Sequence, residues 1–450
     1  MTSEGVRVGV LSLHNSKETK AILNAVEDLG HEPIWLREEN TAIDIRDGYV
    51  ALEPEVDVVA NRLLLSNTEQ PCEALGLVDA YDHLVPVLNE PEAVLTAIHK
   101  FSTGTALAAA GIPVPDALLA LNSDRLNEGR STFGEEAVYK TAIGTHGGGT
   151  WKVGPEEQVN ARVGQRQALL QALIDRDEGR HRDLRVYVVG DRIVGAMERF
   201  APEDDWRTNV ALGGDVVDAG ELPAEVEQIA RGATETLGLD CSGVDLIEGN
   251  DGWYVLEVNP TAGFKGLYKA TGTSPAPYIA QLAIEYGGGS VDDESVEELS
   301  HVLDDSVPTS KPVRPARTTA ETPVIGYTEE VVLSGTSGSE SVIAKSDTGA
   351  TRTSIDTRLA ADIGAGPIKN IMRVKSGSVK NGKTRPLVDV VVGIGGQQHT
   401  VTASIEDRGH MNYPVLLGRD ILENYQVDVR KRVDGERSEK EREEEEEEAQ

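Results

Sequence analysis

The sequence has little cysteine, few aromatic side chains and no long uninterrupted apolar run. Its two cysteines, Cys72 and Cys241, are too far apart in the chain to suggest a metal-binding pair. Such scarcity fits a protein that folds without disulfide bonds in a reducing compartment. No segment reaches the length of a membrane span, and the N-terminus lacks the basic and apolar regions of a signal peptide. We therefore expect a cytoplasmic protein with no membrane partner.

Basic residues are also scarce relative to acidic ones. The chain has 43 Lys and Arg against 76 Asp and Glu, which gives a formal net charge of −33. A charge of this size repels phosphate backbones, so we expect no nucleic-acid partner. The acidic residues are mostly spread along the chain, although Glu443–Glu448 form a terminal run. Dispersed acidity predicts a halophilic protein that stays soluble in concentrated salt, with an ordinary acidic cytosolic protein as the alternative.

The first two regions of the chain alternate between helix and strand patterns. The apolar run Val6–Leu13 is followed by helical spacing over Lys17–Leu29 and by another strand pattern at Val56–Leu65. This β-α-β order predicts a small parallel, Rossmann-like α/β domain over residues 1–90. Helices and strands then mix without that order, so we expect an α+β domain over residues 91–287.

The rest of the chain divides into a linker, a β-rich domain and a tail. Residues 288–323 are dominated by Asp, Glu, Ser, Thr and Pro without apolar periodicity, so we predict a flexible linker. Residues 324–430 contain short strand patterns separated by glycine turns, which is typical of a small all-β domain. Residues 431–450 are mostly charged, and we predict a disordered acidic tail.

The most informative stretch is an acidic hairpin, Gly243–Gly263. Two apolar strands flank Asn250–Gly252, whose final glycine permits a bulged three-residue loop. Counting outward from this loop places Asp245 opposite Glu257. Asn259 is two residues further along and points to the same face of the sheet. Two carboxylates and one amide oxygen therefore converge on one patch.

The two facing carboxylates of this hairpin repel each other unless a cation or a proton lies between them. Oxygen ligands of this kind suit magnesium, which leaves its other positions to water and nucleotide phosphates. We therefore predict a magnesium site at Asp245, Glu257 and Asn259. The alternative is a set of solvent-facing groups in an acid-rich protein, with Asn259 before Pro260 serving only as a turn signal.

Lysine is scarce, so its positions are informative. Lys140 ends a strand pattern and precedes a glycine-rich loop. The backbone N–H groups of Gly147, Gly148 and Gly149 in that loop can wrap a polyphosphate. Lys100, at the start of a helix, is a second candidate for neutralising phosphate charge. A mobile turn remains the alternative for the glycine run.

Arginines recur in the apolar strands that follow. Arg185 and Arg199 lie within strand patterns, where an arginine is unfavourable unless it meets an anion. That anion could be a phosphate or one of the many protein carboxylates. Arg207 and Asn209 lie in the next loop.

In chain order, these motifs resemble the RimK-like glutamate ligase branch of the ATP-grasp superfamily. The resemblance rests on Lys100, on Lys140 with its glycine loop, and on DLRVYVVG, WRTNVALGG, GVDLIEG and LEVNPTAGFKGLYKATG, and it covers about Met1–Gly287. It implies a Rossmann-like pre-ATP-grasp domain followed by an ATP-grasp domain. In that family a carboxylate takes the γ-phosphoryl group of ATP to give an acyl phosphate, and an amine then displaces phosphate.

The resemblance also implies roles for the candidate residues. Lys100, Lys140, the three glycines and Arg185 would bind ATP, and Arg207 and Asn209 would lie near phosphate and acceptor. The hairpin residues would hold two magnesium ions, with manganese as a substitute. The implied partners are glutamate and an amine on a protein or a small molecule.

One departure from the family pattern concerns the nucleotide. The family usually has an acid in the strand that contacts adenine, where this chain has Ala172. Asp175, Asp177 and Glu178 are nearby candidates for the ribose.

The C-terminal region carries a different motif. Asp347-Thr348-Gly349-Ala350 follows a strand pattern directly, and a second apolar run ends at Gly418. In aspartic proteases such a turn presents one of two carboxylates that share a proton to activate water. The region resembles the retropepsin-like fold of the RimB type, once described as an ATP-dependent zinc protease.

A single DTGA motif means that catalysis by Asp347 would need a homodimer or higher oligomer. Zinc binding has no support, because His399 and His410 are isolated. We therefore predict an ATP-dependent carboxylate–amine ligase, adding glutamate to an amine, with an aspartic-peptidase-like domain attached. The alternatives are an acidic-peptide hydrolase regulated by a nucleotide-binding half and a non-catalytic scaffold that binds nucleotide.

Overall fold

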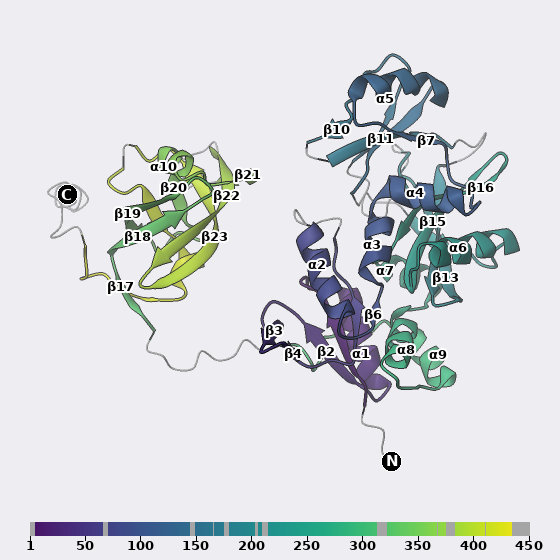
Figure 1. The fold of residues 1–450 in the computed structure, drawn as a ribbon, viewed down its shortest axis with the longest axis horizontal. Coiled ribbons are helices and arrows are strands. Elements are labelled where there is room, and N and C mark those ends of the chain that lie inside the picture. The colour runs from purple at the N-terminus through teal and green to yellow at the C-terminus, as the bar shows by residue number, and fades with distance from the viewer. Residues whose placement is uncertain are drawn as a thin grey trace. The chain divides into compact units, whose positions relative to one another are not determined.

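The chain forms two compact units, Met1–Arg314 and Pro315–Gln450, in a computed structural model (Figure 1). The structure describes residues 5–65, 71–144, 149–164, 166–174, 180–202, 206–208, 215–312, 322–366, 368–374, 383–409 and 411–433. Within these ranges, no helix is both long and apolar enough to cross a membrane.

The first sheet is parallel. Its strands follow the order β2-β1-β5-β6, and all neighbouring pairs run in the same direction. Strand β5 is buried along its whole length, as expected where both faces of a parallel sheet are covered. The parallel α/β domain predicted for the start of the chain is confirmed. Its elements are β1 (Arg7–Leu11), α1 (Lys17–Asp28), β2 (Glu32–Leu36), the hairpin β3 (Ala42–Arg46) and β4 (Tyr49–Glu53), β5 (Val58–Asn61), α2 (Pro71–Asp82) and β6 (Val87–Leu88).

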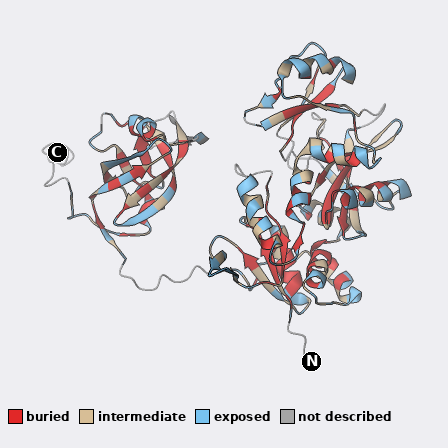
Figure 2. Cartoon of the chain, in the orientation of Figure 1, coloured by how far each residue is buried: buried red, intermediate tan, exposed pale blue. Residues whose placement is uncertain are grey.

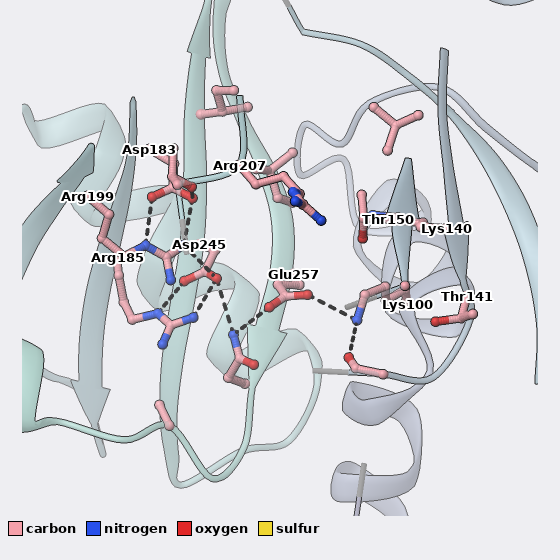
Figure 3. Close-up of a pocket in the computed structure, with 18 of the residues that line it drawn as sticks. Lys100, Lys140, Thr141, Thr150, Asp183, Arg185, Arg199, Arg207, Asp245 and Glu257 are labelled. Carbon is pink, nitrogen blue, oxygen red and sulfur yellow. Dashed lines mark hydrogen bonds and ion pairs between the residues drawn. The ribbon is translucent and has the colours of Figure 1, made fainter. Parts of the chain in front are cut away.

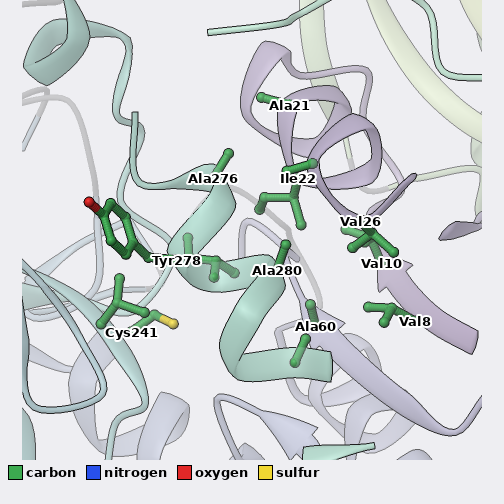
Figure 4. Packing of buried hydrophobic residues seen from close by; sticks show 14 of the residues in the cluster. Val8, Val10, Ala21, Ile22, Val26, Ala60, Cys241, Ala276, Tyr278 and Ala280 are labelled. Atoms are coloured by element: carbon green, nitrogen blue, oxygen red, sulfur yellow. The ribbon is translucent and has the colours of Figure 1, made fainter. Parts of the chain in front are cut away.

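Helix α8 (Ala276–Tyr286) packs on this first sheet, although it comes much later in the sequence. Its Ala276 and Ala280 share a hydrophobic cluster with Val8 of β1 and Ile22 of α1, as Figure 4 shows. The parallel sheet is therefore covered by a helix from the end of the predicted second domain.

The predicted linker begins with folded structure. Helix α9 (Asp293–Ser300) starts after Asp292, whose side chain accepts a hydrogen bond from the Ser295 N–H group. Val296 is fully buried in the same cluster as α8. The linker prediction over 288–323 is therefore wrong for this helix, because the run of acidic residues hides a cap and an apolar contact.

Two antiparallel sheets form the remainder of the first unit. The smaller follows the order β10-β11-β8-β9, with β7 paired to β11, and the larger follows the order β14-β13-β12-β15-β16. Figure 2 shows that the buried positions concentrate on the strands, while the outer sides of the helices are exposed. The elements are α3 (Pro91–Ile98), α4 (Lys100–Ala109), β7 (Ala117–Leu119), α5 (Ser123–Arg130), η1 (Ser131–Phe133), β8 (Ala137–Thr141), β9 (Thr150–Val153), β10 (Arg162–Val163), β11 (Arg166–Ala172), β12 (Arg182–Val189), β13 (Arg192–Phe200), β14 (Asp215–Asp218), α6 (Ala224–Thr236), β15 (Cys241–Gly249), β16 (Gly252–Asn259) and α7 (Lys265–Thr271).

The hairpin of β15 and β16 pairs Asp245 with Glu257, but not by the predicted route. Gly249 pairs with Gly252, so the loop has two residues where three were predicted. A register shift next to Asp245 then leaves Leu256 without a partner on β15. The bulge restores the residue that the shorter loop removed, and the two carboxylates face each other as predicted.

The second unit is a closed β-barrel. Its strands follow the order β18-β19-β24-β20-β23-β22, and β22 pairs with β18 to close the ring. Closure leaves no free edge in this ring, and side chains such as Val331, Val390 and Leu417 fill its core. The predicted all-β domain is confirmed. Its elements are β17 (Val324–Gly326), β18 (Thr328–Ser334), β19 (Ser339–Ser346), β20 (Ser354–Asp356), α10 (Thr357–Asp362), β21 (Ile368–Val374), β22 (Lys383–Ile394), β23 (Gln397–Glu406), β24 (Val415–Leu417), α11 (Arg419–Leu422) and β25 (Gln426–Asp428).

Candidate active site

A cavity of about 470 Å³ lies where the two antiparallel sheets and the parallel domain meet. Its walls come from β8 and β11 of the smaller sheet, from β12, β15 and β16 of the larger sheet, and from two loops of the parallel domain. Figure 3 shows the polar side chains on these walls turned toward one another. Most of the residues predicted as functional line this single space.

Lys100 meets the acidic hairpin directly. Its Nζ atom lies 3.1 Å from Oε2 of Glu257 and donates a 2.7 Å hydrogen bond to the carbonyl oxygen of Gly144 (Figure 3). Lys100 is the first residue of α4, and the preceding His99 caps that helix by accepting from the Ser102 N–H group. The break between α3 and α4 therefore positions the lysine at the cavity.

Glu257 is held as a carboxylate by this contact. Burial alone would raise its pKa, but the Lys100 ammonium, with Arg185 and Lys140 behind it, lowers the pKa far below the usual range of a glutamate. An ionised glutamate beside a lysine can exchange that partner for another cation.

Lys140 is more deeply buried and has no carboxylate in contact among the described residues. Its side chain is 6% exposed, and Nζ donates a 2.7 Å hydrogen bond to Oε1 of Gln171 on the paired strand β11. Burial and the nearby Lys100 ammonium lower the pKa of Lys140 to about 7. Gln171 was not predicted as a partner of Lys140. The pairing of its strand β11 with β8 is the signal that could have identified it.

Asp245 is the centre of a buried chain of alternating charges. Arg185 binds both its oxygens, with Nε–Oδ1 at 2.5 Å and Nη2–Oδ2 at 2.6 Å. Arg199 approaches Oδ2 of Asp245 at 2.9 Å and binds both oxygens of Asp183 at 2.7 and 2.6 Å. Burial pushes the pKa of Asp245 upward, and the two guanidinium groups push it downward. The sequence left either a phosphate or a protein carboxylate as the partner of these arginines. In the structure, both arginines pair with protein carboxylates (Figure 3).

The oxygen donors of the hairpin fit a magnesium ion in chemistry. The amide nitrogen of Asn259 lies 3.2 Å from Oε1 of Glu257 and 3.4 Å from Oδ2 of Asp245, so all three side chains share one face. Hard oxygen ligands of this kind are those that magnesium prefers. Across the described part of the chain, no three His, Cys, Asp or Glu side chains cluster closely enough to hold a metal. A magnesium site here would therefore need the Asn259 oxygen and groups from outside the protein.

The remaining predicted residues divide into those inside and those outside the described ranges. Gly149 accepts a 2.9 Å hydrogen bond from the Thr141 N–H group, and a side chain at Gly149 would come within 2.7 Å of Thr141 Oγ1. Arg207 lines the cavity. Gly147, Gly148 and Asn209 lie outside the described residues, as do the ribose candidates Asp175, Asp177 and Glu178.

One end of the cavity is apolar. It is lined by side chains that cannot form ion pairs, namely Val138, Ala172, Leu173, Ile174, Ile247 and Leu256. An apolar slot that ends in lysines and carboxylates can hold a flat ring at one end and phosphates at the other. Ala172 widens this slot where the family pattern has an acid.

The second unit presents its DTGA turn beside the run that ends at Gly418. Oδ1 of Asp347 accepts hydrogen bonds from the N–H groups of Gly349 at 3.0 Å and Ala350 at 3.2 Å. The Asp347 N–H group donates to the Leu417 carbonyl at 3.0 Å. A side chain at Gly418 would come within 2.3 Å of the backbone at Arg352, so only glycine fits there.

The isolated histidines contribute no metal site that the structure describes. His399 Nε2 lies 2.6 Å from the hydroxyl of Tyr425, and the two rings meet edge to face. His399 therefore packs against Tyr425. His410 lies outside the described residues.

Two family models match the chain. The RimK-like ATP-grasp domain matches residues 97–282, and the retropepsin-like aspartic endopeptidase RimB matches residues 364–437. The second match begins after Asp347. The predicted ATP-grasp and retropepsin-like domains are confirmed.

Relatives and solved structures agree with the first match. The chain is 34% identical over 213 residues to the tetrahydromethanopterin:α-L-glutamate ligase of Methanocaldococcus jannaschii, covering 46% of this chain and 72% of that protein. It is 36% identical over 242 residues to a probable α-L-glutamate ligase of Haemophilus ducreyi, covering 52% and 76%. The ATP-grasp ligase PsnB, solved with minimal precursor, Mg and ADP, matches with a TM-score of 0.51 at 20% identity, covering 64% of this chain and 99% of that one.

Proposed function

Because the chain belongs to the RimK-like ATP-grasp family of α-L-glutamate ligases, we propose that it uses ATP to form an amide bond with glutamate as one of the two joined molecules. The proposed reaction requires magnesium, as two ions, and passes through an acyl phosphate. The retropepsin-like barrel is a second, attached domain of the same chain.

One observation carries this proposal. The two lysines expected to face phosphate and the three oxygen donors expected to hold magnesium line one cavity, where Lys100 Nζ lies 3.1 Å from Glu257 Oε2. Phosphoryl transfer needs little more from a protein than positioning and neutralisation of charge. A site that gathers lysines, arginines, carboxylates and an amide, with an apolar slot beside them, suits that chemistry.

The residues of the chain would divide the work as follows. Lys100 and Lys140 would neutralise the phosphates, and the backbone N–H groups of Gly147, Gly148 and Gly149 would bind them. Glu257, Asn259 and Asp245 would hold magnesium, which when bound offsets the charge that develops on the phosphates. Arg207 and Asn209 would lie near the phosphate and the second substrate.

The proposed chemistry balances in two steps. A carboxylate oxygen attacks the γ-phosphorus of ATP, the bond to the β–γ bridging oxygen breaks, and ADP leaves. An amine then attacks the acyl carbon, phosphate leaves with the former carboxylate oxygen, and the amine loses a proton. No covalent bond to the protein is required.

The relatives indicate two kinds of second substrate. One relative is a tetrahydromethanopterin:α-L-glutamate ligase, and the solved structure of the ATP-grasp ligase PsnB contains a minimal precursor. A small molecule and a peptide are therefore both compatible with the cavity. Glutamate carries a carboxylate and an amine, and either group can be the one that reacts.

Isotope labelling tests the proposal and separates these two cases. The protein is incubated with ATP, magnesium, candidate second substrates and glutamate labelled with ¹⁸O in its carboxylates. We expect ADP release, a product heavier by one glutamyl unit and, if glutamate is activated, ¹⁸O in the released phosphate. Loss of the reaction in Glu257→Gln but not in Glu235→Gln, on the exposed side of α6, assigns it to the cavity. Absence of ADP release with every candidate would overturn the proposal.

For the barrel we propose cleavage of acidic peptides by Asp347, which would need a homodimer to supply a second carboxylate. The turn that holds Asp347 by two N–H groups supports this role. Incubation with glutamate-rich peptides and mass spectrometry should show cleavage that Asp347→Asn abolishes. ADP release by the same variant should be unchanged, and cleavage that survives in Asp347→Asn would contradict the role.

A further inference from the structure

Arg62 is a buried guanidinium without a carboxylate. It follows β5 directly, and its side chain is 7% exposed. Its Nη2 atom donates a 3.1 Å hydrogen bond to the carbonyl oxygen of Ala262, and its Cζ atom lies 5.9 Å from the ring centre of Phe264. Its Nε atom is buried and has no hydrogen-bond partner. Among the described residues, no Asp or Glu comes within ion-pair distance of Arg62.

The other buried arginines of the chain show how unusual this is. Arg185 and Arg199 bind aspartates, and Arg408 lies 2.7 Å from Glu406. Arg130 also lacks a carboxylate and also has a buried Nε atom without a partner, but its other nitrogens donate to three backbone carbonyl groups. Arg62 has one such acceptor. A buried charge with a single neutral acceptor is unfavourable for folding, so an anion bound beside Arg62 would stabilise it.

The position of Arg62 shows where that anion comes from. Arg62 lines the same cavity as Lys100, Glu257 and Asn259, on the wall formed by the parallel domain. The side chain is therefore aimed into the space where the reacting groups are expected. The phosphates already have two lysines and the magnesium ligands, so Arg62 is left for the other substrate.

The surrounding charges favour a single carboxylate at this point. Glu18 lines the same end of the cavity and acts on Arg62 through space without an ion pair between them. A nearby carboxylate disfavours a polyanion such as a phosphate more than it disfavours one unit charge. A guanidinium is also the group that binds a carboxylate through two parallel hydrogen bonds.

We propose that Arg62 binds a carboxylate of glutamate that does not react. This inference rests on the proposed ligase function and names the group that would select the acidic substrate. The guanidinium fixes one carboxylate of glutamate, so that its reacting group is directed at the centre of the cavity. Arg62 thereby acts as a binding and specificity residue.

The test measures glutamate binding without turnover. Isothermal titration with glutamate, in the presence of magnesium and a non-hydrolysable ATP analogue, compares the wild type with Arg62→Gln. We expect the Kd for glutamate to rise by about 10- to 100-fold, since a hydrogen-bonded charge pair is lost. Arg62→Lys should recover part of the affinity, and Arg231→Gln, on the exposed surface of α6, should change nothing.

A second comparison identifies the group on the ligand. The two monoamides of glutamate, each lacking one carboxylate charge, are titrated against both proteins. One of the amides should bind the wild type as weakly as glutamate binds Arg62→Gln, and that amide should lose nothing further in the variant. Equal losses for both amides in the variant, or an unchanged Kd for glutamate, would overturn the inference.

The outcomes separate this inference from the proposed function. Tight glutamate binding that depends on Arg62, without ADP release in any reaction, supports Arg62 and counts against the ligase proposal. Ligase activity in the wild type, together with an unchanged Kd for glutamate in Arg62→Gln, supports the ligase proposal and counts against the role of Arg62. A weaker affinity for the ATP analogue in the variant would assign Arg62 to the nucleotide and overturn the inference.

Discussion

Two groups of buried cations line one cavity and differ in what neutralises them. Arg185 and Arg199 are bound to Asp245 and Asp183 by short, two-point contacts. Lys140 and Arg62 are equally buried, but each rests on a single neutral oxygen acceptor, from Gln171 or a backbone carbonyl. The first group is complete within the protein, whereas the second is not.

This difference distinguishes cations that stabilise the fold from cations that are available to bind a ligand. A guanidinium with its own carboxylate contributes to folding, because removing either partner leaves the other buried and uncompensated. A cation with only a neutral partner contributes little to folding and gains its anion when a ligand binds.

The largest effect is expected at Arg199. Among the described residues, Arg199→Met leaves Asp183 without an ion pair and Asp245 with only the pair to Arg185. We therefore expect the free energy of unfolding to fall by about 3–5 kcal/mol. Urea denaturation followed by circular dichroism measures this change. The control Arg182→Met, which breaks the more exposed contact with Glu198, should lower it by less than about 1 kcal/mol. Similar losses in both variants would contradict the comparison.

Lys100 belongs to both groups, because it meets Glu257 and faces the expected phosphates. In Lys100→Met we expect kcat/KM for ATP to fall by about 100- to 1000-fold, since one preorganised cation is lost from the site of phosphoryl transfer. Steady-state ADP release measures this fall, and Lys269→Met on the exposed side of α7 is the control. A lower free energy of unfolding with unchanged kcat/KM would show that Lys100 does not contribute to catalysis.

Lys140 should make nucleotide binding depend on pH. Its pKa is lowered to about 7, so the free protein loses this charge as the pH rises above 7, whereas a bound phosphate would raise the pKa again. Binding above pH 7 then requires uptake of a proton, and the affinity for ATP should fall by at most about tenfold per pH unit. Titration between pH 7 and 9 measures this slope. Lys140→Arg should flatten it, and an equal slope in the variant would assign it to another group.

The smallest effect is expected for the folding stability of Arg62→Gln. Removing a buried charge that has no carboxylate should leave the free energy of unfolding within about 1 kcal/mol of the wild type or raise it. The same urea titration measures it. A loss as large as that of Arg199→Met would show that Arg62 holds the fold and would contradict its place in the second group.

Structural features set by residues close together in the chain were predicted better than contacts between residues far apart in the chain. Helix α1 lies where the sequence predicted it, over Lys17–Asp28 against a predicted Lys17–Leu29, because its apolar spacing is a local signal. The facing of Asp245 and Glu257 was predicted correctly, but only because a shorter loop and a bulge offset each other. Both corrections lie within one hairpin, where local spacing still constrains the answer.

The partners of the buried arginines could not be predicted in this way. Arg185 and Asp245 are 60 residues apart, and Arg62 and Ala262 are 200 apart, so only the folded sheet brings them together. Helix α9 was missed because its capping and packing are masked by acidic residues. The halophilic character inferred from composition stays a prediction, because the fold does not measure the response of stability to salt.

The packing of α8 on β1 and α1 has a consequence for how the chain is made. Synthesis proceeds from the N-terminus, and domains generally fold as they emerge. Here Val8 and Ile22 lack their apolar neighbours Ala276 and Ala280 until those residues have also been added. The apolar surface of the N-terminal residues therefore stays exposed until almost the whole ligase region has left the ribosome.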